Sequence, residues 1–132
     1  EVYMNAEDDA ADFFEYEVLA DAALDITGWT IVISAGGGDD HVIEDGLMQP
    51  GLSAFEQPSF PEYASELNVT GVIYLYDASG VRRYQMGWDG LAEDGSFSLG
   101  YAPGDTGAAD CYDTATCNLS VLTPTKGTEN QL

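Results

Sequence analysis

The chain has 132 residues, of which 45% are hydrophobic, which is enough apolar material for one domain with a packed core over residues 1–132. It carries 3 Lys and Arg residues against 24 Asp and Glu residues, so its formal net charge is −21 at pH 7. Nucleic acids and anionic membranes are bound through cationic contacts, and this charge argues against both as partners. No apolar run approaches the roughly 18 to 20 residues needed to insert through a bilayer.

Short apolar and polar alternations, separated by turn residues and without a helical period, predict an all-β fold. This spacing of strands is typical of a sandwich or a barrel. The expected strands lie near residues 1–4, 13–19, 29–34, 66–69, 72–76, 81–88, 97–101 and 118–122.

The first long strand and the one after it each place apolar side chains on one face. Phe14, Tyr16 and Val18 alternate with glutamates, and Trp29 begins a similar alternation with Ile31 and Ile33. Gly28 allows a tight bend before the indole, while Leu24 and Ile26 can anchor the intervening loop to the core. The expected core contains Phe14, Tyr16, Trp29, Ile31, Ile73 and Leu75. Substitution of a buried Trp29 by Ala should then cost about 3–5 kcal/mol.

The middle of the chain contains the turn signals. Residues 36–41 begin with three glycines and predict a long flexible turn. Pro50, Pro58 and Pro61 exclude a central strand and predict a segment that runs over the surface or covers a sheet edge. Residues 77–80, Asp-Ala-Ser-Gly between two apolar runs, are the clearest hairpin turn.

An aromatic stripe is expected on that hairpin. If Ile73 and Leu75 point inward, Tyr74 and Tyr76 point outward, and Tyr84, Met86 and Trp88 alternate likewise on the next strand. The stripe is either covered by the Pro-rich segment or available for another subunit or a ligand, since aromatic residues are enriched in interfaces. Arg82 and Arg83 beside it form either local ion pairs or a docking point for an acidic neighbour.

Two cysteines, Cys111 and Cys117, stand six positions apart in a Gly-, Asp- and Thr-rich segment. We expect them to form a disulfide in an oxidising compartment, with free buried thiols and a metal site as the alternatives. The first residue is Glu1 rather than Met, and no signal peptide precedes it, which favours an exported, processed protein or a fragment of a longer one. Asn68 and Asn118 begin sequons that allow glycosylation in a eukaryotic source.

The acidity has two interpretations: a solvated surface suited to salty water, or carboxylate pairs that bind divalent cations. Calcium is the one cofactor that the composition suggests, although no cluster has the EF-hand pattern. The candidate ligands are Glu7, Asp8, Asp9 and Asp12; Asp89, Glu93 and Asp94; and Asp105, Asp110 and Asp113. His41, the only imidazole, lies beside acids in a glycine-rich turn, so no catalytic triad is expected and the chain is not predicted to be an enzyme.

Several short motifs occur in a particular order along the chain. They are EVYMN at 1–5, DFFEY at 12–16, DAALDITGWTI at 21–31, LYDASGV at 75–81, DGSF at 94–97 and TPTKGTEN at 123–130. In this order they resemble the lamin tail domain family, of the exported microbial type. The resemblance implies an immunoglobulin-like β-sandwich that binds or connects and has no catalytic residues. Residues 47–67 and 111–117 depart from the family pattern, and the second segment looks like an insertion.

Two functions from different classes follow. The first is a structural, extracellular or cell-surface subunit that associates with copies of itself into a fibre or coat, through Tyr74, Tyr76, Arg82, Arg83 and cation-bridged carboxylates. The second is an accessory domain that attaches a multi-domain secreted enzyme to a surface or a glycan.

Overall fold

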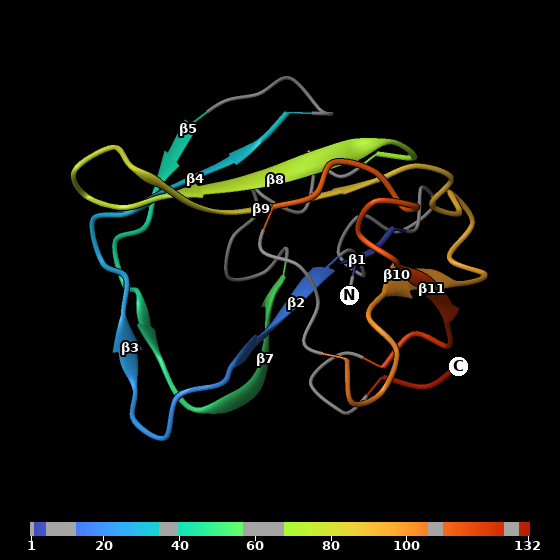
Figure 1. Cartoon of the computed structure of the whole chain (residues 1–132), viewed down its shortest axis with the longest axis horizontal. Helices are drawn as coiled ribbons and strands as arrows, with labels where there is room; N and C mark the ends of the chain where they lie inside the picture. Colours follow the sequence, from blue (N-terminus) through green and yellow to red (C-terminus); the bar gives the residue numbers. More distant parts are fainter. Residues whose placement is uncertain (1, 5–12, 35–39, 57–67, 106–109, 126–129) are drawn as a thin grey trace.

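The computed structural model describes residues 2–4, 13–34, 40–56, 68–105, 110–125 and 130–132. Every regular element in these residues is a β-strand, which confirms the all-β prediction (Figure 1). The strands are β1 (Val2–Tyr3), β2 (Phe13–Val18), β3 (Leu24–Asp25), β4 (Thr30–Ile33), β5 (Asp40–Val42), β6 (Leu47–Met48), β7 (Gly51–Glu56), β8 (Gly71–Tyr76), β9 (Arg82–Trp88), β10 (Ser98–Gly100) and β11 (Ser120–Leu122).

The strands form three sheets in which all paired strands run antiparallel. A five-stranded sheet has the order β11-β10-β1-β2-β7, and a four-stranded sheet has the order β5-β4-β8-β9. The third is a short ribbon of β3 and β6, which stands at the side of the other two sheets in Figure 1. The two larger sheets form separate layers, and the ribbon spans the distance between them.

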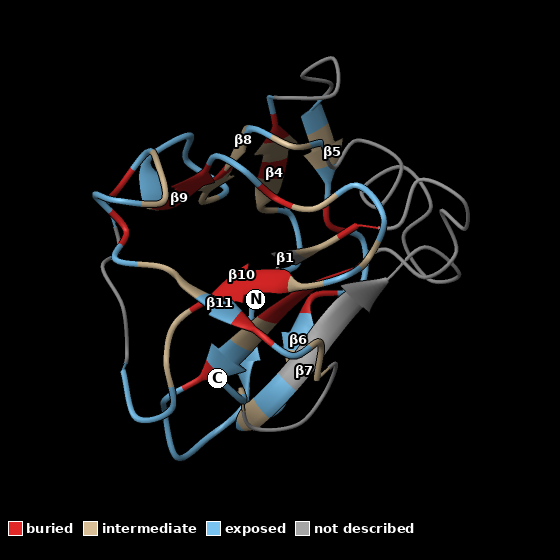
Figure 2. Ribbon diagram, turned by 90° about the vertical axis from the view of Figure 1, so that its right-hand side faces the viewer, coloured by how far each residue is buried: buried red, intermediate tan, exposed pale blue. Residues whose placement is uncertain are grey.

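The core lies between the two larger sheets, and β10 is buried along its length (Figure 2). Ile33 and Trp88 are completely buried, and Met86 and Leu99 are nearly so. Of the six expected core residues, Phe14, Ile31 and Ile73 are buried. The other three, Tyr16, Trp29 and Leu75, are only partly buried and pack against the same cluster.

The face assignment of β9 corrects the expected aromatic stripe. Ile73 is paired with Met86, Leu75 with Tyr84 and Gly71 with Trp88. Paired residues of antiparallel strands share a face, so Tyr84, Met86 and Trp88 lie on the inner face with Ile73 and not beside Tyr74 and Tyr76. Alternation showed correctly which residues share a face, but it left open which face turns inward.

The hairpin of β8 and β9 is confirmed. Asp77 N–H donates to the Val81 carbonyl at 2.8 Å, and Gly80 has the positive φ of 81° that this turn requires. The register shifts next to the turn, where Tyr76 is paired with Arg82 and Leu75 with Tyr84. Arg83 is therefore the extra residue of a β-bulge.

Several strands were not expected. β5 occupies the end of the glycine-rich turn, β3 and β6 pair across a loop, and β7 lies in the Pro-containing segment. β7 is nevertheless an edge strand, as expected for a region whose prolines exclude a central strand. The strand expected near 66–69 is absent at Asn68 and Val69, which lie in a bend before β8, and its first two positions are outside the described residues.

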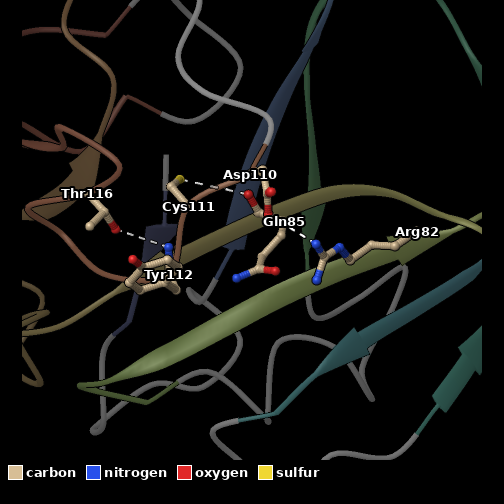
Figure 3. Close-up of polar contacts among 6 residues, drawn as sticks. All are labelled: Arg82, Gln85, Asp110, Cys111, Tyr112 and Thr116. Carbon is tan, nitrogen blue, oxygen red and sulfur yellow. Dashed lines mark hydrogen bonds and ion pairs between the residues drawn. The ribbon is translucent and has the colours of Figure 1, made fainter.

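The cysteine pair forms the expected disulfide, with an S–S distance of 2.04 Å. Its segment runs beside the edge of β9, where Asp110 forms a parallel bridge with Gln85 and Cys111 N–H donates to the Gln85 carbonyl at 3.3 Å (Figure 3). The backbone of Tyr112 comes so close to Gly87 that a Cβ there would overlap it. The disulfide segment therefore covers an otherwise open sheet edge.

Candidate functional site: a cavity between the sheets

A cavity of about 470 Å³ lies between β2 and β7 on one side and β4, β8 and β9 on the other. Its walls are mainly apolar and aromatic. The four-stranded sheet contributes Ile31, Ile73, Leu75, Tyr84 and Met86, and the five-stranded sheet contributes Phe14, Tyr16, Val18 and Leu52. Leu24 and Met48, which are paired across the ribbon, complete the wall at the side.

The rim of the cavity exposes apolar side chains to solvent. Leu19 is 64% exposed, Leu24 46% and Leu52 37%. Ile26 is buried, so of the two residues expected to anchor the loop to the core, Ile26 does so and Leu24 lies at the rim. An exposed apolar rim around a hollow is the kind of surface that marks a binding site.

Backbone hydrogen bonds between the residues before β4 and the residue after β5 fix the position of Trp29 on the cavity wall. Gly28 N–H donates to the Ile43 carbonyl at 2.8 Å, and Ile43 N–H donates to the Trp29 carbonyl at 2.9 Å. Gly28 has a φ of 84°, which confirms the tight bend expected before the indole. Asp25 Oδ1 accepts bonds from the hydroxyl and N–H of Thr27, and these bonds lower the pKa of Asp25.

A second hollow of about 350 Å³ adjoins the cavity and forms its vestibule. Both hollows are lined by Glu17, Leu19, Leu52, Tyr101, Asp105 and Asn130. The turn at 101–105 shapes the vestibule, with Asp105 N–H donating to the Ala102 carbonyl at 2.9 Å and Gly104 at a φ of 81°. Asn130 Nδ2 donates to the Tyr101 carbonyl at 2.7 Å, which holds the end of the chain against this turn.

The cavity wall carries little positive charge. Arg83 lines the cavity, but its Nε donates to Asp77 Oδ2 at 2.8 Å, so its charge is paired. Burial raises the pKa of Tyr84, and the neighbouring Tyr101 raises it further through its charge and a hydrogen bond. Tyr84 therefore stays neutral at physiological pH. The carboxylates of the site are Glu17 and Asp105, which line both hollows, and the buried Glu15, which lines the cavity alone.

Of the four residues expected to form an interface, Arg83 lines the cavity and the other three do not. Tyr74 and Tyr76 are half-buried on the outer face of β8, with ring centroids 6.2 Å apart. Arg82 pairs with Asp110 at 3.2 Å, as Figure 3 shows, and Arg83 pairs with Asp77. Both arginines therefore form local ion pairs, which is the first of the two interpretations given for them.

The acidic residues suggested as calcium ligands are dispersed. Asp8, Asp9 and Asp12 lie outside the described residues, and within those residues no group of three or more His, Cys, Asp or Glu side chains could hold a metal. Three of the expected ligands instead accept backbone hydrogen bonds: Asp89 from Thr114 at 2.9 Å, Asp94 from Ser96 at 3.0 Å and Asp113 from Thr116 at 2.6 Å. These bonds use carboxylate oxygens that a cation would need. The hydroxyl and N–H of Ser96 lower the pKa of Asp94, and the N–H and hydroxyl of Thr116 lower the pKa of Asp113.

The two sequon asparagines are exposed and lie outside the strands, Asn118 in a turn. Asn68 Oδ1 accepts a hydrogen bond from Val69 N–H at 2.8 Å, and the Asn68 carbonyl accepts one from Trp88 Nε1 at 2.8 Å. Asn118 has a φ of 55° next to Cys117. Their glycosylation remains a prediction.

Sequence analysis did not identify the cavity, because its lining comes from segments more than 100 residues apart in the chain. The sequence does show the apolar faces of β2, β4 and β8 that line the cavity, but their alternation predicts an ordinary packed core. Apolar walls with a few polar groups at one end are the usual composition of a small-molecule pocket, so this arrangement is suited to binding.

The described residues contain no helix with the length and apolar character needed to cross a membrane. Comparison of the chain with protein-family models, with curated proteins and with solved structures gives no match.

Proposed function

We propose that this chain is a non-enzymatic interaction domain that binds a small, largely apolar molecule between its sheets. The observation that carries the proposal is the cavity of about 470 Å³ with Tyr16, Trp29 and Leu75 on its wall. Its volume lies within the range of about 300–1,000 Å³ found for ligand pockets.

The apolar walls of the cavity face solvent through its open rim, so they contribute less to the stability of the fold than apolar side chains in the packed core. The partly buried Trp29, Tyr16 and Leu75 would lose further exposed apolar surface when a ligand enters. A ligand that covers this apolar surface therefore stabilises the folded chain.

We include three further features in this proposal. The two larger sheets form an immunoglobulin-like sandwich of the lamin-tail kind, a hypothesis supported by two antiparallel layers around a shared core. The protein works outside the cell, supported by the disulfide between Cys111 and Cys117. A binding domain of this kind also fits the accessory role in a larger secreted protein.

The two tryptophans provide a test of binding in the cavity. Trp29 lines it, whereas Trp88 is completely buried and is not among its lining residues. The neutral probe N-phenyl-1-naphthylamine should bind saturably at one site and quench Trp29. The variant W29F should remove the quenching and retain the increase in probe fluorescence.

A cavity-filling variant makes the test specific. We expect L75W to weaken probe binding by about tenfold, equivalent to 1.4 kcal/mol. The matched control is V81W, which adds an indole at the hairpin turn, where Val81 is 50% exposed and outside the cavity. Unsaturable probe uptake, or equal affinities of folded L75W and V81W, would contradict the proposal.

Self-association is a second candidate function, favoured by the Tyr74 and Tyr76 pair on the outer face of β8. A net charge of −21 makes copies repel at low salt, so association should require screening. Sedimentation across a sodium chloride series should show larger species at high salt, and fewer of them for Y76S. Y112S is the control because Tyr112 is 67% exposed on the disulfide segment. A wild-type protein that stays monomeric at all salt concentrations excludes this function.

A further inference from the structure

We infer that the ligand of the cavity is an amphiphile with an apolar body and a protonated amine head, bound with the head in the vestibule. This inference rests on the proposed function and adds the chemical class of the ligand. It depends on where the polar groups lie: the cavity wall is mainly apolar, and the exposed carboxylates of Glu17 and Asp105 and the amide of Asn130 line the part that it shares with the vestibule.

The orientation follows from the cost of burying charge. An ammonium group deep in the cavity, beside apolar side chains such as Ile73 and Met86, would lose its hydration. At the vestibule it remains close to water and to the carboxylates of Glu17 and Asp105. The apolar body then fills the space between the sheets, where contact with Trp29 and Tyr16 replaces exposed apolar surface.

The charge of the site selects against an anionic head. The described residues that line the two hollows include one cation, Arg83, and Asp77 already pairs with it at 2.8 Å. A carboxylate head would meet Glu17 and Asp105 as like charges, within the field of a chain whose net charge is −21. The same field concentrates cations near the protein and favours their entry.

Two further groups at the vestibule favour a hydrogen-bond donor. Asn130 Oδ1 is buried and, among the described residues, has no hydrogen-bond partner, while its Nδ2 is held by the Tyr101 carbonyl. A buried acceptor without a donor costs about 1–3 kcal/mol, so a donor at this wall would relieve the cost after a small side-chain rotation. The ring of Tyr101 also lines both hollows and offers a face to a cation.

Three probes that share one chain length and differ in head group test the inference: decylammonium, decanol and decanoate, each below its micelle concentration. Affinity is measured by calorimetry and by displacement of N-phenyl-1-naphthylamine. We expect decylammonium to bind about tenfold more tightly than decanol, since two partly exposed carboxylates each contribute up to about 1 kcal/mol. Decanoate should bind most weakly, and the preference for the amine should shrink in 1 M salt as charges are screened at about 3 Å.

A matched pair of variants locates the effect. E17Q should weaken decylammonium about threefold and leave decanol unchanged, because a single exposed charge contributes about 0.2–1 kcal/mol. E93Q removes the same charge from an exposed residue that lines neither hollow, and it should change neither affinity.

The outcomes separate this inference from the proposed function. If all three probes bind equally, or decanoate binds best, the amine head is wrong although the cavity binds apolar molecules. If E17Q and E93Q weaken decylammonium equally, the head does not lie in the vestibule. If no decyl compound binds and the neutral naphthylamine is also rejected, the proposed function itself fails.

Discussion

The space between the two larger sheets is filled at one end and hollow at the other. At the filled end Trp88 has no exposed surface, and Leu99 and both cysteines of the disulfide belong to the same buried cluster. At the hollow end Trp29 is partly exposed on the wall of a cavity. Both ends are built from similar apolar residues, so composition does not distinguish them.

The difference lies in what closes each end. The disulfide segment lies along β9, where Gly87 allows the backbone of Tyr112 to approach. At the other end a ribbon of two short strands connects the layers, and Leu24 and Met48 line the cavity instead of filling it. The segment that covers an apolar strand face therefore decides whether that face becomes part of the packed core or part of the wall of a cavity.

The largest expected effect comes from the two tryptophans. W88A should lower the free energy of unfolding by about 3–5 kcal/mol, because it leaves a large cavity and removes a hydrogen bond to the Asn68 carbonyl. W29A should cost about 1 kcal/mol, since its ring already borders a hollow, which corrects the larger cost expected from sequence. Urea denaturation measures both, and equal costs would refute the contrast between the two ends.

The next effect tests how the filled end is closed. G87A should cost about 3 kcal/mol, because the new Cβ overlaps the Tyr112 backbone and the disulfide segment must move. Y112A should change stability by less than about 0.5 kcal/mol, since that side chain is exposed. If G87A unfolds at the same urea concentration as wild type, the segment does not lie against β9 as described.

A smaller effect concerns the hairpin that positions Arg83. Hydrogen bonds from Val81, Arg83 and Ser79 lower the pKa of Asp77, whose ordinary value is 3.8. A carboxyl with a lowered pKa in the folded state stabilises the fold above the ordinary value and loses that contribution as pH falls through the folded value.

D77N should therefore be less stable than wild type at pH 7, and the difference should shrink as the pH is lowered below about 4. Thermal unfolding at a series of pH values measures this, with D21N as a control that removes one exposed charge. A difference between wild type and D77N that grows in acid would contradict the assignment of these hydrogen bonds.

Local sequence determined the features that depend on neighbouring residues. Alternation identified β2, β4, β8 and β9, the Asp-Ala-Ser-Gly turn identified the hairpin, and the six-residue spacing of the cysteines identified the disulfide. These features follow from the period of a strand, the φ preference of glycine and the reach of a short loop, none of which needs the rest of the fold.

Tertiary structure decided which faces turn inward, where the cavity lies and what surrounds each charge. Period two groups Tyr84 with Met86 and Trp88, but the pairing of β8 with β9 and the opposing sheet place that group inside. Carboxylates close in sequence, such as Asp110 and Asp113, have different partners: Asp110 pairs with Arg82, and Asp113 accepts a hydrogen bond from Thr116. Phe14 and Asn130 both line the cavity although they lie far apart in the sequence, and only the arrangement of the sheets could bring them to one site.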